Sequence, residues 1–268
     1  MTDARQFLGI EPIEDDLHWR LRVVPELTTP GNFLFGGCGL AAALVALEQA
    51  SGLPTIWATA QYLSYAPTDA VLDLTVTLAA VGKRVTQGRV VANVGDKEIL
   101  TVNGAVGTAG SMDIGGVWVG PPEVPPPDAC PLRRLPFPTA SIFDRVETRL
   151  AKGLSFEELS AGPLGPTDAA SALWARVPGH LEPSAATLAI FGDYVTGGLS
   201  QAIGRQVMSR SLDNTLRVVS LEPTEWVLCD IHIQALAGGY GQGVGYLWSE
   251  TGALLATASQ SMSVRLWD

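Results

Sequence analysis

Two kinds of hydrophobic pattern recur along the chain and predict its elements. Apolar, alanine-rich segments at 37–51 and 184–203 contain few β-branched residues and are long enough to be helices. Pro183-Ser184 precedes the second segment, and serine is a favoured N-cap. The stretches LDLTVTL at 72–78 and CDIHIQA at 229–235 alternate polar and apolar residues. Such alternation is typical of strands in an antiparallel sheet that is covered on one side.

Further strands complete both parts of the chain. Strand candidates precede the helices at 17–24 (LHWRLRVV) and 172–177 (ALWARV). Later strands are separated by glycine-bearing turns, with Gly95 and Gly252 at predicted hairpins. The segment 141–153 fits an edge strand or a short helix, and its pattern leaves both open.

The chain repeats itself at a nearly constant offset. FGGCGLAAAL at 35–44 resembles FGDYVTGGLS at 191–200, an offset of 156 residues. The same offset aligns QYLSYAPTD at 61–69 with RVVSLEPTE at 217–225, and one inserted residue then changes it to 157. Two distant copies indicate two homologous halves, not a solenoid.

A proline-rich stretch separates the halves. Residues 121–138 contain eight prolines, which excludes a helix or central strand and predicts an extended, semi-rigid connector. We therefore predict an N-terminal domain at 1–110, a linker and connecting segment at 111–167, and a C-terminal domain at 168–268.

One helix followed by a run of antiparallel strands, twice over, is an α+β pattern. A sheet wrapped around a long apolar helix buries that helix, which is the hotdog arrangement. Two tandem copies form a double hotdog, and edge pairing between them would give one continuous sheet.

Composition and charge exclude several classes of protein. With 47% apolar and 16% charged residues, the chain is globular, not disordered. Its net charge of −10 argues against nucleic-acid binding. The longest apolar stretch, 34–47, is too short to span a membrane, and no secretory signal is visible. Three cysteines without a C-x-x-C argue against a disulfide framework and favour the cytoplasm. Three histidines without metal-ligand spacing favour no metal, and no other cofactor is expected.

Two polar side chains stand out in apolar surroundings. In LLATASQSMSV at 254–264, Gln260 falls on the apolar face of the strand. Asp193 lies in LAIFGDYVTGGL, and its repeat counterpart is Gly37, so the fold does not require an acid there. A buried amide or carboxylate needs a strong partner or a cavity. The alternative for Gln260 is a structural glutamine whose hydrogen bonds are satisfied, and the alternative for Asp193 is a solvated turn.

A third candidate, Ser211, opens the predicted strand SLDNTLRVV and has Thr55 as its counterpart, while Gln260 aligns with Asn103. The second half thus carries Asp, Ser and Gln where the first carries Gly, Thr and Asn. We infer that the second half holds the chemistry and that the first completes the pocket. Cys38 is another nucleophile candidate, although a buried structural cysteine is the simpler interpretation.

Several segments resemble the acyl-CoA thioesterase II family of double-hotdog proteins. They are FLFGG at 33–37, LAIFGDY at 188–194, SLDNT at 211–215, EWVLCDI at 225–231 and GALLATASQSMSVR at 252–265. In that family an aspartate, a threonine or serine, and a glutamine hold the hydrolytic water. The resemblance implies that Asp193, Ser211 and Gln260 do so here, and that acyl-CoA thioesters are hydrolysed to free acid and CoA.

Two positions depart from the family pattern. Asn214 stands where the family usually has histidine, and Tyr240-Gly241 replaces an Arg-Gly pair. These departures bear on substrate placement and rate. One alternative is a non-catalytic acyl-CoA-binding or scaffolding hotdog. Another is a hotdog hydratase or dehydratase acting on enoyl thioesters, which would need an Asp/His pair close in sequence.

The implied partner is an acyl-CoA whose chain enters the apolar space beside the helices. Its phosphates have four candidate partners, although scattered surface charge explains each as well: Lys83, Arg84, Arg205 and Arg210. By analogy with other hotdog proteins, a homodimer of double hotdogs is expected.

Overall fold

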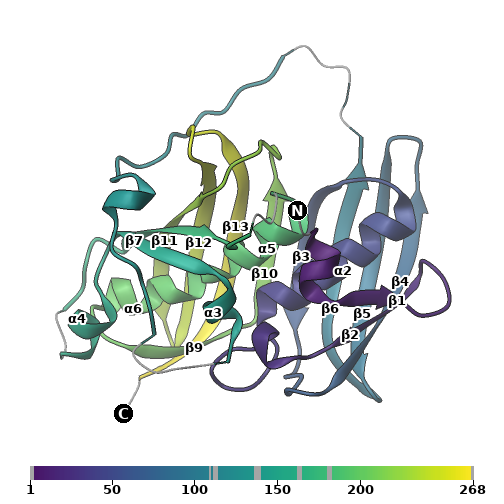
Figure 1. Ribbon diagram of the computed structural model, residues 1–268, viewed down its shortest axis with the longest axis horizontal. Helices are drawn as coiled ribbons and strands as arrows, with labels where there is room; N and C mark the ends of the chain where they lie inside the picture. Colours follow the sequence, from purple (N-terminus) through teal and green to yellow (C-terminus); the bar gives the residue numbers. More distant parts are fainter. Residues whose placement is uncertain are drawn as a thin grey trace.

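The computed structural model describes residues 3–108, 110, 114–135, 140–161, 165–179 and 183–266. Within these residues the strands form one antiparallel sheet of 13 strands (Figure 1). In spatial order they are β1 (Ile10–Pro12), β2 (His18–Arg22), β4 (Val71–Val81), β5 (Val85–Val94), β6 (Lys97–Gly107), β3 (Thr55–Tyr62), β10 (Asp213–Val218), β13 (Leu254–Leu266), β12 (Tyr240–Ser249), β11 (Val227–Ala237), β8 (Ala170–Arg176) and β7 (Glu147–Lys152), with β9 (Val207–Ser211) paired to β13.

The two halves meet at β3 and β10, which confirms the prediction of a continuous sheet. Thr59 pairs with Thr215 in this antiparallel contact, and the two hydroxyl oxygens lie 2.8 Å apart. These threonines are counterparts at the repeat offset of 156. A residue pairing with its own counterpart means that a local two-fold relationship passes through this point. The architecture is the predicted double hotdog, although the domain boundaries at residues 110 and 167 stay a prediction.

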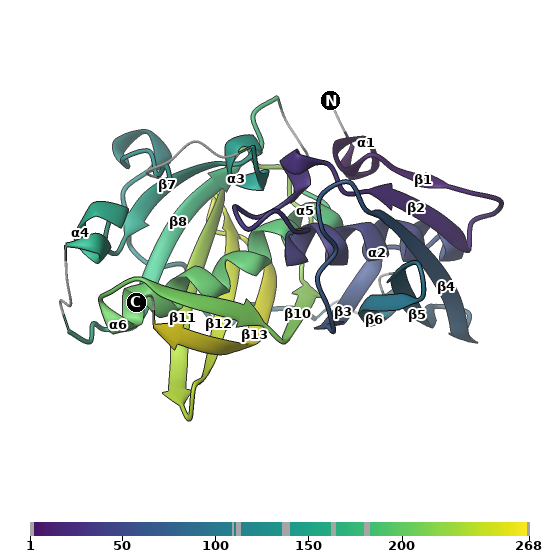
Figure 2. The same cartoon turned by 90° about the horizontal axis from the view of Figure 1, so that it is seen from below.

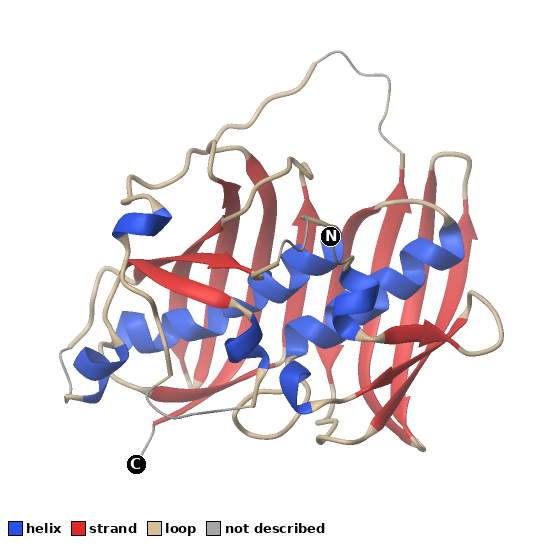
Figure 3. Ribbon diagram, in the orientation of Figure 1, coloured by secondary structure: helices blue, strands red, loops and turns tan. Residues whose placement is uncertain are grey.

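The central helices lie on one face of the sheet, which curves around them (Figures 2 and 3). In the first half α2 (Gly36–Ser51) is buried at every residue from Gly37 to Leu47, which confirms the predicted helix. A helix that is apolar all round is expected to be enclosed. Among the helices of the described residues, none is long and apolar enough to cross a membrane.

The second half differs from the single helix predicted at 184–203. It contains α5 (Ala185–Gly192), a 3₁₀ helix η3 (Asp193–Gly197) and α6 (Gly198–Ile203). The predicted N-cap is confirmed, since Ser184 Oγ accepts a hydrogen bond from the Thr187 N–H at 3.1 Å. α5 ends at Gly192, directly before Asp193, whose side chain is buried.

Smaller elements settle the segment that the sequence left open. Residues 141–153 contain both a short helix and a strand: α3 is capped by Ser141, and β7 then forms the sheet edge. Gly95 and Gly252 adopt positive φ angles at the predicted hairpin turns. The remaining helices are α1 (Ala4–Leu8), η1 (Pro25–Leu27), η2 (Pro127–Ala129), α3 (Ile142–Arg145) and α4 (Phe156–Ser160).

The prediction of a sheet covered on one side is wrong for the second half. The described part of the proline-rich connector packs on the outer face, where a second apolar cluster includes Cys130, Trp174, Trp226 and Trp248. The Trp174 indole N–H donates to the Pro125 carbonyl at 2.9 Å. Residues 136–138 of the predicted connector, and His180, lie outside the described residues.

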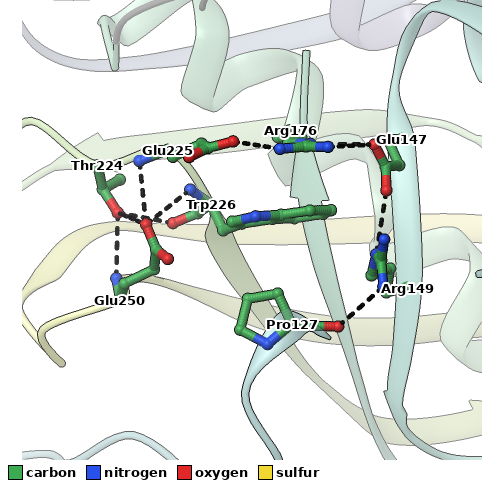
Figure 4. Close-up of polar contacts among 8 residues, drawn as sticks. All are labelled: Pro127, Glu147, Arg149, Arg176, Thr224, Glu225, Trp226 and Glu250. Carbon is green, nitrogen blue, oxygen red and sulfur yellow. Dashed lines mark hydrogen bonds and ion pairs between the residues drawn. The ribbon is translucent and has the colours of Figure 1, made fainter. Parts of the chain in front are cut away.

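Charged side chains fasten this connector to the sheet edge (Figure 4). The Arg176 guanidinium stacks over the Trp226 ring at 4.3 Å, and it forms ion pairs with Glu225 and, at 2.7 Å, with Glu147. Glu147 also pairs with Arg149 at 3.0 Å, and Arg149 donates to the Pro127 carbonyl at 3.3 Å. The connector is therefore a structural part of the second half.

Candidate active site

The fold brings together the three site residues predicted from the sequence. Asp193 begins η3, Gln260 lies on β13, and Ser211 ends β9. The Gln260 side-chain N–H group donates to Asp193 Oδ1 and also faces Ser211 Oγ at 3.4 Å. Asp193 and Gln260 are each only 3% exposed, whereas Ser211 is half-buried. The cluster thus joins a buried carboxylate to a hydroxyl nearer the surface.

The main chain places Asp193 against the first turn of α2. Gly192 allows α5 to approach β13, because a Cβ there would lie 3.1 Å from Ala258 Cβ. The first N–H groups of a helix lack partners within it, and the N-cap residue of α2, Phe35, supplies no side-chain acceptor. Asp193 Oδ2 instead accepts from the Gly37 N–H at 2.7 Å. A carboxylate is favoured at this positive end of the helix.

Asn214, the departure from the family pattern, is part of the same cluster. Its side-chain amide donates to Asp193 Oδ1 at 3.3 Å, and the residue is 1% exposed. Oδ1 therefore accepts from both Gln260 and Asn214. The residue that replaces the usual histidine acts on the carboxylate directly.

These surroundings set the protonation of Asp193. Burial raises the pKa of Asp193 to about 7, against the opposing effect of hydrogen bonds from Gly37, Gln260 and Asn214. A carboxyl that changes charge near neutral pH is suited to accept a proton in catalysis.

Ser211 does not open a strand, contrary to the prediction. It ends β9, and β10 begins at Asp213. Ser211 pairs with Met262 and Thr215 pairs with Ser259, so this side of the ladder has one extra residue. An extra residue makes a β-bulge, which redirects nearby side chains. The Asp213 carboxylate stabilises the irregularity by accepting from the Ser261 N–H at 2.7 Å.

The alignment of Gln260 with Asn103 is also wrong. Asn103 pairs with Thr59 as Ser259 pairs with Thr215, so Asn103 is equivalent to Ser259 and is exposed. The sequence offset of 157 shifted the register by one residue, which moves a side chain to the opposite face.

The corrected register explains why the first half has no second site of this kind. At the offset of 156 fixed by Thr59 and Thr215, three small residues take the places of Asp193, Asn214 and Gln260: Gly37, Ala58 and Gly104. A Cβ on Gly104 would lie 3.4 Å from Leu47 Cδ2, so α2 packs where the second half has its polar cluster.

Sequence reasoning missed Tyr62, at the end of β3. Its hydroxyl is buried and has no hydrogen-bond partner among the described residues, and the same holds for Asn214 Oδ1 and Gln260 Oε1. The repeat carried a signal, because the counterpart of Tyr62 at the offset of 156 is Val218. The fold therefore accepts an apolar residue there and does not require a hydroxyl.

The other sequence candidates lie apart from this cluster or beside it. Cys38 is buried, and burial raises the pKa of its thiol, which makes it a poor nucleophile. Lys83 and Arg84 are in the exposed turn after β4, and Tyr240 is exposed at the start of β12. Arg210 adjoins Ser211, and its guanidinium lies 4.7 Å from the centre of the Tyr65 ring. The phosphate-binding role of Lys83, Arg84, Arg205 and Arg210 stays a prediction.

A pocket of about 610 Å³ has Arg133, Phe143 and Phe156 among its lining residues, and no residue of the cluster lines it. The Phe143 ring lies 6.1 Å from that of Tyr194, the residue after Asp193. The Arg133 guanidinium stacks over Phe156 at 4.3 Å, and burial lowers its pKa. Within the described part of the chain, Arg133 forms no ion pair with a carboxylate.

Comparison with known proteins agrees with this architecture. The family model of the acyl-CoA thioesterase N-terminal domain matches residues 24–108, and that of the acyl-CoA thioesterase C-terminal domain matches residues 121–264. No curated protein sequence matches the chain. The structure of a protein assigned as a thioesterase from Novosphingobium aromaticivorans DSM 12444 is 31% identical, with a TM-score of 0.84. The match covers 95% of this chain and 98% of the other.

Two mycobacterial structures share the fold at lower identity. The TesB protein of Mycobacterium avium subs paratuberculosis is 20% identical with a TM-score of 0.80, and the match covers 98% of each chain. An acyl-CoA thioesterase II of Mycobacterium marinum is 18% identical with a TM-score of 0.75, over 99% of this chain and 98% of its own. With family models matching both halves, the chain belongs to the acyl-CoA thioesterase family of double-hotdog thioester hydrolases.

Proposed function

We propose that the protein hydrolyses acyl-CoA thioesters with a water molecule held by Asp193, Ser211 and Gln260. The observation that carries this proposal is the Gln260 amide, which bridges a buried carboxylate and a hydroxyl. A water among these groups can be oriented by the serine and the glutamine and can give its proton to Asp193.

The reaction then needs no covalent enzyme intermediate. The water oxygen bonds to the thioester carbonyl carbon as its proton moves to Asp193. The tetrahedral intermediate breaks the carbon–sulfur bond, so the free acid and CoA thiolate are released, and the proton on Asp193 passes to the thiolate or to solvent. The positive N-terminal end of α2 adjoins the carboxylate, and its dipole would favour the negative charge that develops on the carbonyl oxygen.

For part of the CoA group, we propose the pocket beside Phe143. Its size lies in the range of small-molecule sites. Arg133 supports a role in binding a phosphate, because it is a half-buried guanidinium without a carboxylate partner in the described chain. Two acids also line this pocket but are engaged elsewhere: Glu147 binds two arginines, and Asp144 accepts from the Ser141 N–H.

The test is thiol release from a panel of short, medium, long and branched acyl-CoAs. We expect turnover by the wild type and a fall in kcat of about 10²–10⁴-fold in Asp193→Asn, the usual range for a general base. Asp230→Asn is the matched control, because Asp230 is another buried aspartate of the second half but pairs with His232 outside the cluster. Unchanged turnover in Asp193→Asn would remove Asp193 as the base. No release by folded wild type would favour an acyl-CoA-binding hotdog.

Assembly is a separate question. A homodimer of double hotdogs stays a prediction, which light scattering coupled to gel filtration would check.

A further inference from the structure

Tyr62 approaches the buried carboxylate from the first half of the chain. It ends β3, and both Tyr62 and Asp193 lie close to Gly36, the first residue of α2. A Cβ built on Gly36 would lie 3.0 Å from Asp193 Oδ2 and 3.1 Å from Tyr62 Oη. The phenol and the carboxylate therefore converge on one point beside the helix N-terminus, and a glycine is what leaves room there.

The hydroxyl of Tyr62 is available to a ligand. It is buried and forms no hydrogen bond within 3.5 Å among the described residues, although the Asn214 side chain lies close enough to lower its pKa. Leaving such a group unsatisfied costs about 1–3 kcal/mol, so buried hydroxyls in native proteins nearly always serve a partner. Gln260 Oε1 and Asn214 Oδ1, beside the same carboxylate, are also buried and form no hydrogen bond among the described residues. These polar atoms, which form no hydrogen bond within 3.5 Å around one buried acid, indicate a site that can receive polar atoms of a substrate or water.

The two oxygens of Asp193 divide this site into two sides. Oδ1 faces the amides of Gln260 and Asn214, and through Gln260 it reaches Ser211. Oδ2 faces the Gly37 N–H and lies close to Gly36. The proposed water occupies the Oδ1 side. Tyr62 reaches the Oδ2 side through Gly36, and its hydroxyl is also close to the Asn214 side chain. The carbonyl oxygen of a thioester attacked by that water can lie between the phenol and the helix N-terminus.

We propose that Tyr62 is a catalytic residue, and that its hydroxyl donates a hydrogen bond to the thioester carbonyl oxygen and to the oxyanion formed from it. This inference rests on the proposed function and adds a donor from the half that lacks the acid. Burial, and to a smaller extent the charge of Asp193, raise the pKa of Tyr62 well above its ordinary value against the opposing effect of the Asn214 side chain, so the phenol keeps its proton throughout the working range. The residue acts as a neutral donor and transfers no proton.

A positioning role would have different consequences. The same hydroxyl could donate to Asp193 Oδ2 or Asn214 Oδ1 and so hold the base in place. Loss of a donor to the carboxylate would raise the pKa of Asp193 and shift the acid limb of the pH–rate profile upward. Loss of an oxyanion donor would lower kcat at every pH and leave that limb in place.

The experiment compares Tyr62→Phe with the wild type over a range of pH. We expect kcat to fall about 10²–10³-fold, the usual effect of removing one oxyanion donor, with little change in KM. Tyr65→Phe is the matched control, because it removes an exposed hydroxyl from the same segment. An unchanged kcat, or a loss of activity explained by an upward shift of the acid limb, would overturn the catalytic role.

A second measurement begins with the wild type, where the result does not depend on how the variant folds. A ketone analogue of acyl-CoA, with a methylene in place of sulfur and a ¹³C carbonyl, is bound and its C=O stretch is recorded. We expect a lower frequency than in water, partly restored in Tyr62→Phe. A frequency unchanged from that in water contradicts the proposal. If wild type binds the analogue but releases no thiol, the hydrolytic function fails instead.

Discussion

Asp193 and Gly37 are counterparts in the two halves of the chain, and they are hydrogen-bonded to each other. The Gly37 N–H donates to Asp193 Oδ2 at 2.7 Å across 156 residues, the offset of the repeat. The acid of one half thus caps the central helix of the other. A structural role, as helix cap, and the proposed catalytic role, as base, fall on the same carboxylate, so variants must separate the two.

Gly37→Ala is expected to disturb this contact. A Cβ at Gly37 would lie 2.9 Å from both the Ala189 carbonyl oxygen and Ile190 Cα. These are backbone atoms of α5 and cannot rotate away, so α2 and α5 must separate. We expect a loss of stability of about 1–3 kcal/mol, typical of overpacking, and a fall in kcat because Asp193 shifts. Thermal unfolding and thiol release measure the two effects.

Gly197→Ala is the control for that substitution. Gly197 has helical backbone angles, and nothing lies within 4 Å of a Cβ built on it. The same change should therefore be neutral or raise stability by about 0.4–1 kcal/mol. Equal damage from both substitutions would show that glycine flexibility matters here, and not the close approach of the helices.

The pH dependence of turnover follows from the charge state of Asp193. A base must be deprotonated, and burial raises the pKa of Asp193 to about 7. We expect kcat/KM to rise with pH through a single ionisation near that value. A rate that is flat between pH 5 and 8 would contradict the assignment of Asp193 as the base.

The free energy of unfolding should fall as pH rises, whereas turnover should increase. The folded protein keeps a proton on Asp193 up to about pH 7, whereas the unfolded chain releases it near the ordinary value of 3.8. The folded state therefore binds more protons between these values, and the free energy of unfolding falls as pH rises through them, by up to about 4 kcal/mol. Asp193→Asn should remove most of this slope in urea titrations at a series of pH values.

Asn214→Ala tests the residue at which the chain departs from the family. The Asn214 amide donates to Asp193 Oδ1 and lowers its pKa, so its loss should shift the acid limb of the rate profile to higher pH. Asn103→Ala, at an exposed position of the first half, is the control. A limb that stays in place would mean that Asn214 serves the substrate and not the carboxylate.

The sequence predicted the parts of the fold that depend on periodic patterns. The alternation in 254–264 placed Gln260 on the inner face of β13, where it is buried beside Ala258 and Met262. The repeat singled out Asp193 as the acid whose counterpart is Gly37, and the structure buries it beside Gln260. These inferences succeeded because period two and a constant offset survive in a single sequence.

The failures came from irregular geometry. The bulge at Ser211 leaves no mark on the hydrophobic pattern, so Ser211 was predicted to open a strand. The one-residue insertion assumed in the second copy gave Gln260 the wrong counterpart. Asn103 lies on the opposite face of its strand, and the true counterpart is Gly104. Tyr62 was missed because its importance comes from a contact between distant segments, which only the folded chain brings together.

The last prediction concerns the part of the substrate that the sequence located least well. Four basic residues were candidates for the CoA phosphates, and the structure adds Arg133, a half-buried guanidinium in a pocket beside Phe143. We expect Arg133→Gln to raise KM for acyl-CoA about 10–100-fold, since a hydrogen bond to a charged group contributes about 1.5–3 kcal/mol. The same variant should leave KM unchanged for the N-acetylcysteamine thioester of the same acid, which has no phosphate.

Arg84→Gln, in the exposed turn after β4, is the matched control for loss of one positive charge. If Arg84→Gln raises KM for acyl-CoA and Arg133→Gln does not, the phosphates bind at that turn and the pocket serves another part of the substrate. If Arg133→Gln weakens both thioesters equally, Arg133 supports the fold of the pocket and does not recognise a phosphate.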